Sequence, residues 1–186
     1  MFKVKLLVLG PMGCGKTVLS NFLSRATEMS NISPTVGVRI LEFEQSVDLE
    51  GRNTSVDVEL WDCSGDHVYE SCWPAFAQGV NGILFVFNPH RSNHDKELEN
   101  LFSYFVGQSG LSPKCCLCLS NQLPESLNAR LTSEPPPSFH NVHCIESNLE
   151  TNPDAVRDEF KLFLSSVLVA ISDKQNQEEL SIMNRR

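Results

Sequence analysis

Residues 10–17 have the residue types and spacing of a phosphate-binding loop: they read Gly-Pro-Met-Gly-Cys-Gly-Lys-Thr and match the pattern G-x-x-x-x-G-K-[ST] in full. Glycines in this pattern let the backbone curl until successive N–H groups point at phosphate oxygens. The Lys16 amine supplies a positive charge to the β- and γ-phosphates, and the Thr17 hydroxyl can ligate Mg²⁺. The helix that follows presents its positive N-terminus to the same anion. The expected phosphate-binding residues of this loop are Gly13, Cys14, Gly15, Lys16 and Thr17.

Two further segments carry groups suited to the same metal ion and phosphate. Asp62 ends a predicted strand and is followed three residues later by Gly65. The carboxylate of Asp62 can hold Mg²⁺ through water, and the Gly65 N–H can sense the γ-phosphate. Thr35, in a loop upstream, can bring its hydroxyl to Mg²⁺ only when the triphosphate is present. The order and spacing of these elements favour a switch GTPase; a P-loop kinase or ATPase is the alternative, but no arginine-rich lid is visible.

The strands and helices that must position these residues can be predicted from the sequence. Short apolar runs alternate along it with stretches of helical spacing, which is typical of an α/β fold. We predict a three-layer P-loop NTPase with about six strands in a mostly parallel sheet and helices on both faces. The predicted strands are residues 4–9, 38–47, 55–61, 82–87, 114–119 and 142–145, and residues 50–53 form a plausible hairpin turn. The predicted helices are residues 17–25 and 95–106 and a stretch with helical spacing over residues 156–171.

The domain organisation follows from length and composition. The chain has 186 residues, of which 41% are hydrophobic, so one domain with a substantial core is expected. We predict a G domain over residues 1–171 and a polar, flexible tail over residues 172–186. Residues 122–138 are too rich in proline for a long regular helix.

Charge and cysteine usage exclude several classes of function. The net charge of −8 disfavours binding to nucleic acid or to anionic lipid. No apolar run approaches the ~18 residues needed to span a bilayer, and neither end of the sequence offers a glycine or a cysteine for a lipid anchor. Seven cysteines without a secretion signal suggest reduced thiols in the cytosol. Cys115 and Cys118 form a C-x-x-C pattern, but the segment reads as a buried strand rather than as a zinc or redox site.

Between residues 2 and 171 the sequence resembles the small GTPases of the Ras/Rab superfamily. More specifically, residues 33–44, 59–66, 70–75 and 178–183 are similar to the Rab-like small GTPases of intraflagellar transport complex B. This resemblance implies binding of GTP or GDP with Mg²⁺ and a role in building the cilium or flagellum. It also implies docking onto coiled-coil subunits of that complex, with the protein located in the cytoplasm and the cilium or flagellum.

One departure from the superfamily pattern concerns catalysis. These GTPases usually carry Gln directly after the Asp-x-x-Gly glycine, where it orients the attacking water, but here that position is Asp66. A carboxylate beside the γ-phosphate repels its charge and cannot donate a hydrogen bond as an amide does. Met12 also adds bulk where an activating partner inserts an arginine. We therefore expect at most slow GTP hydrolysis, with Asp66 as a poor catalytic residue.

A second departure concerns the base. The expected Asn-Lys-x-Asp element is reduced to Asn-Gln-Leu-Pro at residues 121–124, and the later Ser-Ala-Lys element appears as Ser-Asn-Leu at residues 147–149. The candidate base-binding residues are Asn121, Ser147 and Asn148. Asn121 is equally compatible with a residue that ends a strand in a turn. The loss of a carboxylate that recognises guanine is expected to cost a few kcal/mol of base discrimination.

The predicted switch segments also carry candidate partner-binding residues. Val36, Tyr69 and Trp73 lie in or beside loops that change with the nucleotide. For Trp73 the alternative is packing of a helix onto the sheet. A second functional alternative is a constitutive structural adaptor, in which the nucleotide serves only to stabilise the fold.

Overall fold

The computed structural model describes residues 2–26, 33–122 and 131–183. In this part of the chain the sheet has six strands, namely β1 (Phe2–Leu9), β2 (Val38–Leu49), β3 (Arg52–Cys63), β4 (Gly82–Phe87), β5 (Cys116–Asn121) and β6 (His143–Ser147). Their spatial order is β2-β3-β1-β4-β5-β6. All neighbouring pairs are parallel except β2 and β3, which are antiparallel. The predicted fold class is confirmed.

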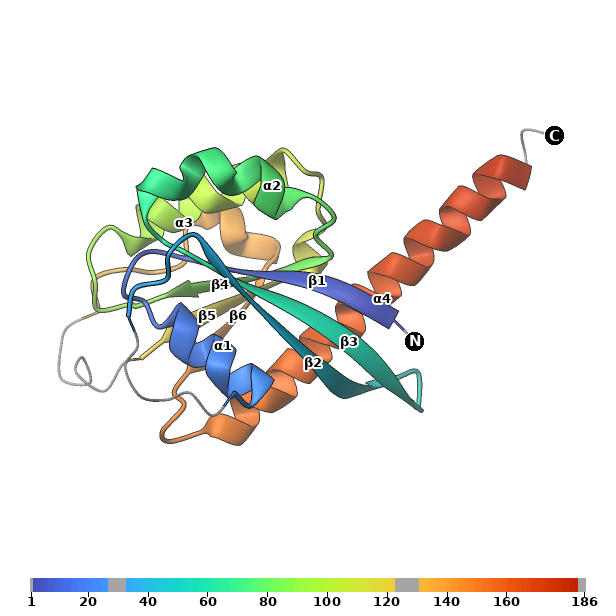
Figure 1. Ribbon diagram of the computed structural model, residues 1–186, viewed down its shortest axis with the longest axis horizontal. Coiled ribbons are helices and arrows are strands. Elements are labelled where there is room, and N and C mark those ends of the chain that lie inside the picture. Colours follow the sequence, from blue (N-terminus) through green and yellow to red (C-terminus); the bar gives the residue numbers. More distant parts are fainter. Residues whose placement is uncertain (1, 27–32, 123–130, 184–186) are drawn as a thin grey trace.

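Helices cover both faces of this sheet (Figure 1). The α-helices are α1 (Lys16–Ser24), α2 (Trp73–Ala77), α3 (His94–Phe102) and α4 (Pro153–Met183). Short helical turns lie at His67–Cys72, Pro113–Cys115 and Pro137–Asn141, and a π-helical turn at Ser103–Gly107. The helix predicted over residues 95–106 is thus divided, because its last turn widens into the π-helical segment. Of the proline-rich stretch 122–138, residues 123–130 lie outside the described part of the chain.

The hairpin between β2 and β3 is tighter than the sequence suggested. Its turn consists of Glu50 and Gly51, whose φ angles are 54° and 78°. Positive φ at both central residues gives a two-residue turn whose twist matches that of the strands. The Gly51 N–H donates to the Asp48 carboxylate at 2.8 Å. Both strands therefore run up to the turn and pair along their full length, from Val38 opposite Cys63 to Leu49 opposite Arg52.

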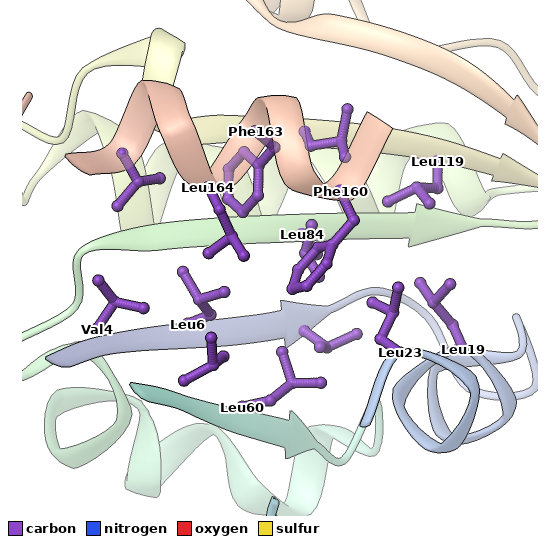
Figure 2. Packing of buried hydrophobic residues seen from close by; sticks show 14 of the residues in the cluster. Val4, Leu6, Leu19, Leu23, Leu60, Leu84, Leu119, Phe160, Phe163 and Leu164 are labelled. Atoms are coloured by element: carbon purple, nitrogen blue, oxygen red, sulfur yellow. The ribbon is translucent and has the colours of Figure 1, made fainter. Parts of the chain in front are cut away.

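One hydrophobic core lies between the sheet and the helices α1 and α4. Figure 2 shows Phe160, Phe163 and Leu164 of α4 packed over Val4 and Leu6 of β1. The second core lies on the opposite face, under α2 and α3, and includes Leu7, Ile83, Phe85, Leu98 and Phe139. Because successive strand residues point to opposite faces, neighbours such as Leu6 and Leu7 belong to different cores. The central strands are consequently buried on both sides, as their continuous apolar runs predicted.

Residues 172–183, within the polar tail predicted as flexible over residues 172–186, are helical in the structure. Residues 172–183 continue α4, which is one helix of 31 residues and projects away from the sheet (Figure 1). Ala170 and Ile171 are the last α4 residues packed against the core, and residues 173–183 are exposed. The composition predicted this exposure but not the helix. No Gly or Pro interrupts the chain after Pro153, and the exposed turns contain Lys, Gln, Glu and Leu, which are strong helix formers.

Candidate nucleotide-binding site

The phosphate-binding loop lies between the end of β1 and the start of α1, as predicted. Gly13 and Gly15 have φ angles of 70° and 93°, which residues with a side chain rarely adopt. At Gly10 a Cβ atom would lie 2.0 Å from the carbonyl oxygen of Val86, so no side chain fits there. These glycines allow the loop to curl around the N-terminus of α1, whose first residue is Lys16. The N–H groups at this helix end are free of intrahelical partners and suit an anion.

Lys16 is held inside the loop rather than extended into solvent. Lys16 is only 7% exposed. The Nζ atom donates to the carbonyl oxygens of Gly10 and Pro11, at 2.8 Å each. The ammonium group is thereby positioned at the mouth of the loop, where the phosphates of a nucleotide are expected.

Three oxygen ligands for a hard cation converge beside Lys16. The Thr17 hydroxyl donates to Asp62 Oδ2 at 2.8 Å and lies 3.0 Å from the Thr35 hydroxyl. Asp62 is fully buried, and its other oxygen, Oδ1, has no hydrogen-bond partner among the described residues. Burial raises the pKa of the Asp62 carboxyl, while the hydrogen bond from Thr17 and the nearby Arg39 guanidinium oppose this shift. Two hydroxyls and an incompletely paired carboxylate fit Mg²⁺, which prefers oxygen ligands.

Gly65 lies directly against the phosphate-binding loop. A Cβ atom on this residue would come within 2.6 Å of the Met12 amide nitrogen and 2.7 Å of the Gly10 carbonyl oxygen. Only glycine therefore allows the Asp-x-x-Gly segment to approach the loop so closely. Gly65 thereby forms part of the wall of the cleft beside the loop, and contact of its N–H with the γ-phosphate stays a prediction.

A cleft of about 710 Å³ opens above these residues. Its walls bring together the phosphate-binding loop, the segment around Thr35 and the segment that follows Gly65, with Met12, Lys16, Thr17, Val36, Asp66 and Tyr69 among the lining residues. A cleft of this size falls in the range of small-molecule and cofactor sites. Of the predicted phosphate and metal residues, Gly13, Gly15, Lys16, Thr17, Thr35 and Gly65 line this cleft. Asp62 and Cys14 are buried behind it, and Asp62 is linked to it through Thr17.

Asp66 has a structural role that the sequence reasoning missed. Its side chain caps the helical turn His67–Cys72 by accepting a hydrogen bond from the Val68 N–H at 3.1 Å. Its own N–H donates to the Ser64 hydroxyl at 3.2 Å. An Asp directly before a helical segment is a strong N-cap signal, so this role was readable from sequence. The cap holds the carboxylate at the edge of the nucleotide cleft.

Two of the three candidate base-binding residues meet in the structure. Asn121 and Ser147 are paired in register at the ends of β5 and β6. The Asn121 amide donates to the Cys14 carbonyl oxygen at 2.8 Å, which ties the end of β5 to the phosphate-binding loop. Ser147 is fully buried, and its hydroxyl has no hydrogen-bond partner within the described ranges. Asn148 instead accepts from the N–H groups of the turn before α4, while residues 123 and 124 lie outside the described residues.

The candidate partner-binding residues divide into two kinds. Val36 is 79% exposed, and Tyr69 lines the nucleotide cleft. Trp73 instead packs against Tyr104 and Phe105, with ring centroids 5.0 and 5.3 Å apart. Trp73 thus packs within the second core, against the segment after α3 rather than against the sheet itself. Partner binding by Val36, Tyr69 and Trp73 stays a prediction.

Two polar residues beside Asp62, namely Arg39 and Asn21, were not predicted. Arg39 of β2 lies opposite Asp62 of β3, and its Nη2 atom is 3.5 Å from Asp62 Oδ2. The same nitrogen donates to Asn21 Oδ1 of α1 at 2.5 Å. Strand alternation could have indicated that the Arg39 side chain faces the core, because Leu41, Phe43 and Val47 lie on the same face of β2 and pack there. A charged residue on the core-facing side of a strand indicates that an opposite charge lies nearby.

The C-x-x-C segment at residues 115–118 lies at the start of β5. Cys115, Cys116 and Cys118 are buried free thiols at or within β5, and burial raises the pKa of Cys116 to about 12. No group of three or more His, Cys, Asp or Glu residues that could hold a metal ion occurs in the described part of the chain. Within the same ranges, no helix is both long and apolar enough to cross a membrane.

The phosphate-binding loop, Thr35 and Asp62-x-x-Gly65, set on this sheet, define the class of Ras-like small GTPases. Comparison with known proteins agrees. Residues 5–122 match the family described as Ras of Complex, Roc, domain of DAPkinase. The intraflagellar transport protein 22 homologs of zebrafish and human are 45% and 40% identical over 186 and 184 aligned residues, which cover 98% of this chain and 100% of each relative. The chain belongs to the intraflagellar transport protein 22 family.

Solved structures of T. brucei IFT22 are also similar to the structure of this chain. The GDP-bound crystal structure of T. brucei IFT22 has a TM-score of 0.69 and 28% identity, covering 91% of this chain and 98% of that one. The GTP-bound crystal structure of T. brucei IFT22/74/81 has a TM-score of 0.65, covering 91% and 99% of the two chains. The predicted resemblance to the small GTPases of intraflagellar transport is therefore confirmed.

Proposed function

We propose that this protein binds GTP and GDP together with Mg²⁺, hydrolyses GTP slowly, and acts as a subunit of complex B of the intraflagellar transport machinery. The convergence of Thr17, Thr35 and Asp62 beside the phosphate-binding loop carries the nucleotide part of this proposal. Relatives crystallised with GTP and with GDP support the guanine base. The expected location is the cytoplasm and the cilium or flagellum, in keeping with the names of the relatives.

Each group in the cleft has a definite task in this function. The N–H groups of the phosphate-binding loop and the Lys16 amine hold the β- and γ-phosphates. Thr17, Thr35 and Asp62 hold Mg²⁺, which when bound neutralises charge on the phosphate oxygens. Asn121 and Ser147 stand at the strand ends beside the loop. The Asn121 amide binds the Cys14 carbonyl oxygen and Ser147 is buried, so both support the base side of the site from below its surface.

The test is the nucleotide carried by the purified protein, released by denaturation and separated by chromatography. We expect guanine nucleotide with a substantial GTP fraction, because Asp66 supplies no amide to orient the attacking water. Single-turnover cleavage of GTP is expected below ~10⁻³ s⁻¹. Adenine nucleotide, no nucleotide, or cleavage well above that rate would contradict the proposal.

Two variants at residue 66 separate its charge from its cap. Asp66→Asn keeps an oxygen that can cap the turn while removing the negative charge. Asp66→Gln supplies the longer amide that small GTPases use to orient water. We expect Asp66→Gln to cleave GTP faster than both the unmodified protein and Asp66→Asn. Equal rates in all three would show that residue 66 does not limit hydrolysis.

We further propose that the protein docks onto coiled-coil subunits through the surface around Val36 and Tyr69. The T. brucei complex named IFT22/74/81 supports the identity of these partners, as counterparts of proteins 74 and 81. Val36 is exposed at the rim of the nucleotide cleft, so a partner seated there contacts the segment that carries Thr35. Apolar groups in such a position are typical anchors of an interface.

Replacing Val36 by Asp is expected to weaken binding to the 74 and 81 counterparts at least about tenfold, because a charge is then buried at the interface. Val169→Asp is the matched control, since Val169 is an exposed valine on α4, away from the cleft. Affinities measured by calorimetry decide the matter. An equal loss in both variants, or none in Val36→Asp, would place the interface elsewhere.

A further inference from the structure

Arg39 occupies a position where the fold calls for an apolar side chain. Leu41, Phe43 and Val47 follow it on the same face of β2 and pack against the core that α1 and α4 cover. Arg39 heads this row and lies opposite Asp62 in the register of β2 and β3. Its side chain is one-third exposed, while that of Asp62 is fully buried. A guanidinium is thus inserted between the sheet and α1 beside the buried carboxylate.

The guanidinium of Arg39 makes one short and one long contact. Its Nη2 atom donates a short hydrogen bond of 2.5 Å to Asn21 Oδ1 and stands 3.5 Å from Asp62 Oδ2. The first contact fixes the group on α1, and the second is an ion pair too long for a normal hydrogen bond. Lys16, the other cation that acts on Asp62, is directed to the carbonyl oxygens of Gly10 and Pro11. Arg39 therefore acts on Asp62 through charge, and it leaves Oδ1, which has no hydrogen-bond partner among the described residues, able to serve another cation.

A buried carboxylate is costly unless an opposite charge accompanies it. A guanidinium supplies that charge at every relevant pH, because it does not lose its proton in proteins. Mg²⁺ supplies the same compensation when it reaches Asp62. The two cations then act on one carboxylate, and like charges held at short range in a poorly solvated site repel each other.

We propose that Arg39 is a resident counter-cation of the magnesium site, which stabilises Asp62 without metal and lowers the affinity of the site for Mg²⁺. This inference rests on the proposed function, in which Thr17, Thr35 and Asp62 bind Mg²⁺ with the nucleotide. It assigns to Arg39 a positioning and tuning role, since the side chain acts through Asp62. The consequence is a nucleotide site whose metal occupancy is set in part by a fixed charge of the protein.

Arg39→Gln tests the proposal, with Arg52→Gln as the matched control. Both variants lose one positive charge, but Arg52 lies at the hairpin end of β3, beside the turn at Glu50 and Gly51. Retention of fluorescently labelled GTP is measured while free Mg²⁺ is varied with a chelator. We expect the Mg²⁺ concentration for half-maximal retention to fall about tenfold in Arg39→Gln, and to remain unchanged in Arg52→Gln. An unchanged or higher concentration in Arg39→Gln would overturn the proposal.

A second readout does not depend on bound nucleotide. Thermal unfolding in chelator should begin at a lower temperature for Arg39→Gln than for Arg52→Gln, because Asp62 has then lost its counter-charge. Arg39→Lys keeps the charge and should behave like the unmodified protein in the Mg²⁺ titration. Arg39→Leu also removes the charge and suits the apolar row of Leu41, Phe43 and Val47, so it should shift the titration in the same direction as Arg39→Gln and serves if that variant does not fold.

The outcomes separate this inference from the function on which it rests. If the unmodified protein retains no GTP at any Mg²⁺ concentration, the proposed function fails. If it retains GTP in a Mg²⁺-dependent way and Arg39→Gln has the same dependence, the function stands and the counter-cation role is wrong.

Discussion

The Lys16→Ala variant is expected to bind GTP at least about a hundredfold more weakly than the unmodified protein, because charge-assisted hydrogen bonds to phosphate are among the strongest in proteins. Lys16 is buried in the loop, where the carbonyl oxygens of Gly10 and Pro11 already fix its ammonium group. Little side-chain entropy is lost when phosphate binds, so most of the interaction appears as affinity. Lys96→Ala, at an exposed lysine of α3, controls for the change in net charge.

Calorimetric titration with GTP and Mg²⁺ measures this effect, and binding within about threefold of the unmodified protein would contradict the assignment of the site. The same variant distinguishes a switch from a constitutive adaptor. In a switch, Lys16→Ala loses affinity for the protein partner along with the nucleotide. In an adaptor, partner affinity is indifferent to the substitution as long as the domain stays folded.

The second large effect concerns stability. Replacing Phe85 by Ala is expected to lower the free energy of unfolding by about 3–5 kcal/mol, the usual cost of emptying a buried aromatic site. Phe85 is fully buried in β4. Its ring meets Phe139 edge-on at 5.0 Å and lies 6.0 Å from Phe102, so its loss opens a cavity shared by three elements.

Urea denaturation gives the free energy of unfolding of each variant. Phe85→Leu fills much of the same volume and should lose clearly less, since the cavity term is smaller. A loss below about 1 kcal/mol in Phe85→Ala would mean that the second core repacks around the missing ring.

The candidate phosphate and metal residues could be chosen from the sequence because their residue types occur in short, contiguous patterns. The glycines, Lys16 and Thr17 form one such pattern, and Asp62 with Gly65 forms another. The parallel sheet then brings the two together, because Val8 at the end of β1 lies beside Asp62 of β3. Connections between parallel strands leave little freedom in this arrangement. The pairing of Asn121 with Ser147 at the ends of β5 and β6 follows from the same kind of parallel arrangement.

What the sequence did not reveal depended on contacts between distant segments. Arg39 acquires its role only when β2 pairs with β3 and α1 packs above them. The π-helical turn after α3 and the packing of Trp73 on Tyr104 likewise depend on tertiary contacts. The outer half of α4 was missed for a different reason. Its polar composition removes the hydrophobic periodicity from which helices are predicted, although its helix propensity is high.

This outer half of α4 has a mechanical consequence. Residues 153–171 of α4 pack on the core, and residues 172–183 extend beyond it as part of the same helix. The exposed residues therefore follow any tilt of the packed ones. Twelve helical residues extend about 18 Å, so a tilt of roughly 10° at Ile171 moves the far end of the helix by about 3 Å. A tilt of the packed part of α4 on the sheet therefore also moves its exposed end. The position of the exposed end thus depends on how α4 lies on the core, about 18 Å away.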